Sequence, residues 1–149
     1  MSDIYLVDDP AMMRDGLRAV LEGAGHRVVG ESDQPTQALA DLVRLVPTLV
    51  LLDLHLGSRS GFELLEQIQK RKLSTRAVML TMSAQPRHVA EAMRLGAQGY
   101  VLKGSPAREV LSAVEAVTLG RKHLGAGVAE LAVEGLMQDA SPGTIESLS

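Results

Sequence analysis

Five polar residues stand where apolar runs of the sequence end. Asp8 and Asp9 follow one run and Asp53 follows another, while a third run ends at Thr81 and a fourth is followed by Lys103. Each acid taken alone would be interpreted as a surface charge or a helix cap. Their coincidence at the ends of these runs instead predicts one cluster with three carboxylates, a hydroxyl and an ammonium group.

Such a cluster has the chemistry needed to transfer a phosphoryl group onto an aspartate. Three carboxylates in one crevice repel one another and need a cation to stay ionised, and oxygen ligands without nearby His or Cys suit Mg²⁺. A carboxylate can act as the nucleophile and form an acyl phosphate, while a lysine and a hydroxyl stabilise phosphoryl oxygens. Asp53 is a better candidate for the nucleophile than Asp8 or Asp9. We expect its strand to lie at the centre, between the strand of the acid pair and the strand that precedes Lys103.

The elements that would position these residues alternate between apolar strands and amphipathic helices. The apolar runs are continuous, which is typical of parallel strands covered on both faces. Residues at helical spacing separate the runs, and Gly or Pro marks most helix ends. Strands are predicted at residues 4–7, 26–31, 49–52, 77–80 and 99–102, and helices at 12–21, 35–45, 62–68, 86–95 and 106–120.

Repeated strand–helix units favour a doubly wound α/β domain. We expect a flavodoxin-like, five-stranded parallel sheet of order 2-1-3-4-5 with helices on both faces, built by residues 1–120. Ligands of this fold bind at the carboxyl ends of the strands, where the polar residues stand. A linker helix and a tail of linker composition from residue 139 are expected within residues 121–149. One face of that helix should carry Val128, Leu131, Ala132, Leu136 and, as a further candidate, Gly135.

Composition excludes several functional classes. The chain has no cysteine, so it has no disulfide scaffold, no thiol nucleophile and no cysteine zinc site. The net charge of −3 is spread evenly, and the only aromatic residues are Tyr5, Phe62 and Tyr100, which argues against a nucleic-acid surface. The N-terminus lacks signal-peptide features and no apolar run reaches the ~20 residues of a membrane span. We therefore expect a soluble, cytoplasmic protein.

Other phosphate-binding or aspartate-based sites fit less well. A phosphotransferase of the haloacid dehalogenase type needs a second acid two residues after the nucleophile, where this chain has His55. A flavodoxin-like FMN site needs a hydroxyl-rich loop after the first strand, and the acids there would repel phosphate. The Gly-Ala-Gly at 23–25 precedes a strand, whereas a Rossmann motif follows one. The four histidines are scattered without metal-ligand spacing.

The chain resembles a response-regulator receiver domain (CheY-like) from residue 3 to about residue 120. Four segments carry the resemblance: Leu-Val-Asp-Asp at 6–9, Leu-Leu-Asp-Leu at 51–54, Leu-Thr at 80–81, and Gly-Ala-Gln-Gly-Tyr-Val-Leu-Lys at 96–103. Each segment alone is weak evidence for the family, but the four segments in this order and at these distances are specific for it. The resemblance implies a signalling domain of a two-component system, which accepts a phosphoryl group from a histidine kinase and is not itself a classical enzyme.

The resemblance also implies roles for individual residues at the acid cluster. Asp53 would be the phosphoacceptor, and Mg²⁺ would be held by Asp53 with Asp8, Asp9 and the backbone carbonyl of His55. Two loop residues depart from the family. Pro10 stands where related chains often have His, and Gly57 stands where many receivers have Pro, which gives the loop after Asp53 more backbone freedom.

A conformational switch is the mechanism that the resemblance implies. The hydroxyl of Thr81 would take the phosphoryl group, Lys103 would pair with it, and Tyr100 would turn inward as Thr81 moves. Phosphorylation would thereby shift a pre-existing equilibrium toward the active conformation. The expected output face lies on the fourth helix, fifth strand and fifth helix. It is centred on Val89, Met93, Val110 and Leu111.

Loop sequences narrow the resemblance to the NarL/FixJ (LuxR-type) group. Gly-Leu-Arg at 16–18 and Lys-Gly-Ser-Pro at 103–106 are similar to that group, whose members carry a C-terminal helix-turn-helix domain. The final Glu-Ser-Leu-Ser resembles the start of that domain, so we expect a fragment of a longer transcriptional regulator. Phosphorylation should favour a homodimer through the output face or residues 126–137, and DNA should bind only through the absent domain. The alternative is a stand-alone or atypical receiver that acts through protein–protein interaction.

Overall fold

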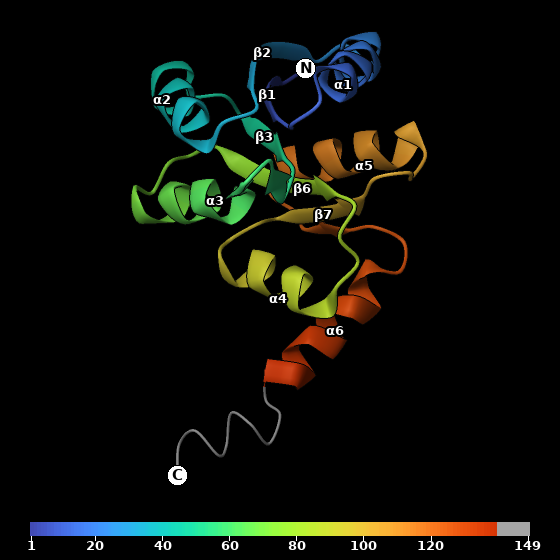
Figure 1. Cartoon of the computed structure of the whole chain (residues 1–149). Coiled ribbons are helices and arrows are strands. Elements are labelled where there is room, and N and C mark those ends of the chain that lie inside the picture. Colours follow the sequence, from blue (N-terminus) through green and yellow to red (C-terminus); the bar gives the residue numbers. More distant parts are fainter. Residues whose placement is uncertain (140–149) are drawn as a thin grey trace.

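The computed structural model describes residues 1–139 and has three layers, with a parallel sheet between two layers of helices (Figure 1). The strands are β1 Asp3–Val7, β2 Arg27–Ser32, β3 Leu49–Leu52, β4 His55–Leu56, β5 Arg59–Ser60, β6 Arg76–Thr81, β7 Gly99–Leu102 and β8 His123–Leu124. The helices are α1 Ala11–Gly23, α2 Pro35–Leu45, α3 Gly61–Lys70, α4 Pro86–Arg94, α5 Ala107–Thr118 and α6 Val128–Asp139.

Helices bury both faces of the sheet, and successive strand residues point to opposite faces. In β1, Ile4 and Leu6 pack toward α1 and α5, whereas Tyr5 and Val7 pack toward α2, α3 and α4. Figure 1 shows the helices divided in this way. Because the strands are buried on both faces, apolar residues occupy successive positions in them, which explains the continuous apolar runs in the sequence. This arrangement confirms the predicted fold class.

The sheet order is β2-β1-β3-β6-β7-β8, and every pairing in it is parallel. The first five strands have the predicted order 2-1-3-4-5. The predicted number of five strands was wrong, because β8 extends the edge through the pairings of Gly99 with His123 and of Tyr100 with Leu124. A two-residue strand of this kind leaves too short an apolar pattern to be recognised in the sequence.

A small antiparallel hairpin, β4–β5, lies in the loop after β3. Its turn contains Gly57, whose φ of 63° lies in the left-handed region that glycine adopts without strain. Proline, with φ fixed near about −65°, cannot take this conformation. A proline at position 57 could therefore not form the turn that this hairpin has.

Helix α6 packs along α4 at the edge of the molecule (Figure 1). The helices approach closely at Gly135, where a Cβ atom would lie 2.1 Å from the carbonyl oxygen of Pro86. The prediction that Leu136 shares the packed face was wrong: its side chain is 60% exposed, whereas Gly135 faces α4. The buried face keeps Val128, with Leu131 and Ala132 packed against the core. The predicted tail beyond residue 139 lies outside the described residues.

Two residues of the predicted output face are core residues instead. Val89 is fully buried on the side of α4 that faces the core, and Val110 is buried on the side of α5 that faces the sheet. Met93 and Leu111 remain half-buried. Apolar side chains on a helix can serve either a core or an interface, and the sequence did not show that the sheet covers two of these four. In the described residues 1–139, no helix combines the length and apolar character required to span a membrane.

Candidate functional site

The carboxyl ends of β1, β3, β6 and β7 meet at one edge of the sheet, because these strands are parallel and successive neighbours. Asp8 and Asp53 come directly after β1 and β3, and Lys103 comes directly after β7. The Lys103 ammonium donates to Asp8 Oδ1 at 3.0 Å and to Asp53 Oδ2 at 2.8 Å. The structure thus brings together three of the predicted residues, from positions up to 95 residues apart in the sequence.

The three charged groups are withdrawn from solvent. Asp8 is 2% exposed and Asp53 is 6% exposed. Burial raises the pKa of Asp8, and the nearby Asp53 charge acts in the same direction, while Lys103 opposes both. Burial alone would lower the pKa of Lys103, but its hydrogen bonds to Asp53 and Asp8, together with the charges of those carboxylates, outweigh burial and raise it. Two carboxylates share one ammonium group, so the cluster carries an excess of negative charge.

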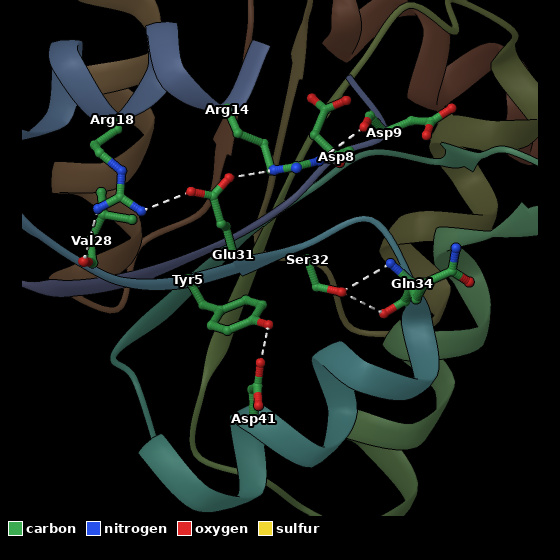
Figure 2. A network of polar contacts seen from close by, with 10 residues as sticks. All are labelled: Tyr5, Asp8, Asp9, Arg14, Arg18, Val28, Glu31, Ser32, Gln34 and Asp41. Atoms are coloured by element: carbon green, nitrogen blue, oxygen red, sulfur yellow. Dashed lines mark hydrogen bonds and ion pairs between the residues drawn. The ribbon is translucent and has the colours of Figure 1, made fainter. Parts of the chain in front are cut away.

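Asp9 departs from the geometry that the sequence predicts. Its side chain is exposed, and Figure 2 shows its carboxylate directed away from that of Asp8. Among the described residues, no three acidic or histidine side chains are placed to hold a metal ion together. The donors nevertheless fit Mg²⁺ chemically, because Asp8 and Asp53 offer buried hard oxygens with surplus negative charge and the Asp9 carboxylate is one residue away. The backbone N–H of His55 makes a hydrogen bond to the predicted acceptor acid, donating to Asp53 Oδ1 at 3.3 Å.

Thr81 and Tyr100 are both connected to Ser83, in the loop between β6 and α4. Thr81 is fully buried, and its Oγ1 accepts from the Ser83 backbone N–H at 3.3 Å. The Tyr100 hydroxyl donates to the Ser83 carbonyl at 2.9 Å. Tyr100 is completely buried, which raises its pKa to about 12. The ring is therefore already inward in this structure, and one residue holds both predicted switch groups.

Sequence reasoning did not predict the side-chain contacts that hold this loop. Ser83 Oγ lies 2.6 Å from His88 Nδ1, and the His88 ring packs edge-on against Phe62 and His55, each at a centroid distance of 6.1 Å. Burial lowers the pKa of His88, helped by Arg87 and His55, so its neutral form is favoured. The histidines are scattered in the sequence, and two of them, His55 and His88, meet only through the fold.

Two further residues shape the site without a signal strong enough to identify them in the sequence. At Gly61, a Cβ atom would lie 2.1 Å from the Asp53 carbonyl oxygen, so a side chain there would displace the loop after β3. Arg14 in α1 donates to the backbone carbonyls of Asp8 and Asp9 (Figure 2). The spacing of six residues between Asp8 and Arg14 would have been the only indication of this contact.

Comparison with known proteins gives a consistent result. The family described as response regulator receiver domain matches residues 4–115. The chain is 30% identical over 131 residues to the response regulator UvrY of Escherichia coli K12, and 33% identical over 122 residues to its nitrate/nitrite response regulator NarL. These matches cover 87% and 81% of this chain but 60% and 56% of the relatives, so the chain spans a little more than half of their length.

Solved structures of the same kind superpose well. A LuxR-family two-component response regulator from Aurantimonas sp. SI85-9A1 has a TM-score of 0.86 at 30% identity, covering 92% of this chain and 99% of that chain. The isolated REC domain of RcsB from Salmonella enterica serovar Typhimurium, solved in the presence of phosphomimetic BeF₃⁻, has a TM-score of 0.79 at 25% identity. It covers 87% of this chain and 97% of that chain.

Proposed function

The chain belongs to the family of response regulator receiver domains, and on this premise we propose that it accepts a phosphoryl group on Asp53 in a Mg²⁺-dependent reaction. The observation that carries the proposal is the Lys103 ammonium, which lies 2.8 Å from Asp53 Oδ2 and 3.0 Å from Asp8 Oδ1. An acceptor carboxylate, a second buried acid and a cation at one sheet edge are the groups that this transfer requires.

In the proposed reaction, a carboxylate oxygen of Asp53 attacks the phosphorus of a phosphohistidine. The new P–O bond forms as the P–N bond breaks, and the histidine of the kinase leaves with the electron pair. Lys103 is in place to pair with the phosphoryl oxygens that develop beside Asp53. Asp8, Asp53, Asp9 and the His55 carbonyl would hold Mg²⁺, which when bound supplies further neutralisation of phosphoryl charge.

The switch would operate through Ser83. The Thr81 hydroxyl can donate its proton to a phosphoryl oxygen, and moving toward Asp53 would change its contact with the Ser83 N–H. Because the Ser83 carbonyl accepts from Tyr100, that movement also changes what holds the ring inward. The phosphoryl group would favour one arrangement only to the extent that its contacts differ between the two.

The longer relatives suggest how the domain would be used. We propose a cytoplasmic transcriptional regulator whose partner is a sensor histidine kinase, and whose phosphorylation promotes homodimerisation. DNA contact would come through a C-terminal domain outside this chain. These roles are carried over from the family and from NarL- and UvrY-type relatives that are longer than this chain.

Intact mass spectrometry tests the proposed function. The chain is incubated with Mg²⁺ and a small-molecule phosphodonor, beside an Asp53→Ala variant and a sample with chelator. We expect a mass increase of one phosphoryl group in the original chain alone. Beryllofluoride binding provides a measurement that does not depend on donor preference. If neither adduct nor beryllofluoride complex forms, the proposal is wrong and the chain is an atypical receiver.

A further inference from the structure

We propose that Arg14 is a positioning residue for the metal site, because its guanidinium group fixes the backbone from which Asp8 and Asp9 project. The same nitrogen, Arg14 Nη1, donates to the carbonyl of Asp8 at 2.5 Å and to the carbonyl of Asp9 at 2.9 Å (Figure 2). This inference rests on the proposed function, since it concerns the Mg²⁺ that the acids would bind. It assigns a role to a residue outside the metal-binding and phosphoacceptor groups.

The guanidinium group is itself held in place from the neighbouring strand. Arg14 Nε donates to Glu31 Oε2 in β2, and the Arg14 side chain is only 14% exposed. The Arg14 and Arg18 hydrogen bonds lower the pKa of Glu31, so this carboxylate stays ionised. Glu31 adjoins Ser32, whose carbonyl accepts from the Asp8 N–H at 3.2 Å. The loop after β1 is therefore tied to β2 from both sides.

Beyond the hydrogen bond from Lys103 to Asp8, the loop is held mainly where the Pro10 carbonyl accepts the first backbone hydrogen bonds of α1. In the described part of the chain, α1 has no side-chain hydrogen bond at its N-cap, because Pro10 occupies that position. Proline also lacks a backbone N–H with which to hold the loop. The Asp9 side chain is exposed and must reorient if it is to approach a cation at Asp8 and Asp53. A fixed peptide backbone leaves only side-chain rotation for that step, which lowers its entropic cost.

The geometry requires arginine rather than any cation. A guanidinium group has five N–H donors in a rigid plane and can serve two carbonyls and a carboxylate at once. Lysine has a single ammonium group, which cannot span the same acceptors. Arg18 provides a matched control: it donates to Glu31 Oε1 at 2.9 Å and to the Val28 carbonyl at 3.4 Å, but not to the Asp8 or Asp9 carbonyl.

Calorimetric titration with MgCl₂ of the full, unphosphorylated chain tests the proposal. The variants are Arg14→Met, Arg14→Lys and the control Arg18→Met, each first checked by thermal denaturation. Loss of a group that orients metal ligands weakens metal binding by roughly tenfold, so we expect that increase in the Mg²⁺ dissociation constant for Arg14→Met. Arg14→Lys should recover part of the affinity, and Arg18→Met should change it less than about twofold.

A phosphorylation assay over a range of Mg²⁺ concentrations separates positioning from a general loss of structure. The Arg14→Met chain should need more Mg²⁺ to reach half of its maximal rate, but its rate at saturation should match that of the original chain. Equal affinity in Arg14→Met and the original chain would overturn the role of Arg14 and leave the proposed function standing. Equal weakening by Arg14→Met and Arg18→Met would also overturn it. If the original chain binds no Mg²⁺, both proposals fail.

Discussion

Replacing Lys103 by Met should destabilise the protein strongly in the absence of divalent cations. The Lys103 side chain is 9% exposed, and it is the ammonium group shared by Asp8 and Asp53, whose side chains are 3% and 7% exposed. Removing one partner of a buried ion pair costs about 3–5 kcal/mol, because the remaining charge is left uncompensated. That loss is a large part of the total stability of about 5–15 kcal/mol expected for a domain.

Urea denaturation in the presence of a chelator measures this loss directly. The control is Lys122→Met, since Lys122 is exposed and its removal should change the free energy of unfolding by less than about 0.5 kcal/mol. Adding Asp8→Asn to Lys103→Met should recover much of the loss by removing one of the two uncompensated charges. Mg²⁺ at a hundred times its dissociation constant adds about 2.7 kcal/mol to the folded state. A loss below about 1 kcal/mol for Lys103→Met would refute this electrostatic reasoning.

Three further predictions concern the same structure. Asp8→Asn should stabilise the metal-free chain at pH 7. Because the pKa of Asp8 is raised in the folded chain, its ionisation above the ordinary pKa of 3.8 lowers the free energy of unfolding. The gain, measured by urea denaturation, should shrink as the pH falls toward 3.8. Gly135→Val should lower the free energy of opening of α6 by about 1–3 kcal/mol, because its Cβ would overlap the Pro86 carbonyl. Hydrogen exchange along α6 measures that change against Ala129→Val on the exposed face. Tyr100→Phe removes the hydrogen bond to the Ser83 carbonyl, and should speed exchange in the β6–α4 loop while leaving phosphorylation of Asp53 intact.

The sequence was sufficient to predict the strand order and the residues at the strand ends. Continuous apolar runs identify buried parallel strands, and the topology of such sheets then brings Asp8, Asp53 and Lys103 to one edge. These predictions succeed because they depend on backbone architecture, which tolerates errors of a residue or two. The individual roles of the site residues came from resemblance to a family, and they stay predictions until the phosphorylation experiments are done.

Features that depend on side-chain rotation or on a single close contact could not be predicted. The outward direction of the Asp9 carboxylate is a local rotamer choice, and the pattern Asp-Asp carries no information about it. Gly135 lies on the packed face of α6 and Leu136 does not, because the close contact with Pro86 leaves no room for a Cβ atom. The contact of Arg14 with the loop after β1 depends on how α1 lies over β2.

Locating the phosphoryl group tests the central claim most directly. The phosphorylated chain is reduced with borohydride, which converts an acyl phosphate into a stable alcohol, and the modified residue is identified by peptide sequencing in a mass spectrometer. We predict modification at Asp53 alone, dependent on Mg²⁺ and lost in Asp53→Ala. Modification of Asp8, Asp9 or another residue, or labelling of Asp53 that chelation leaves unchanged, would contradict the mechanism proposed for this site.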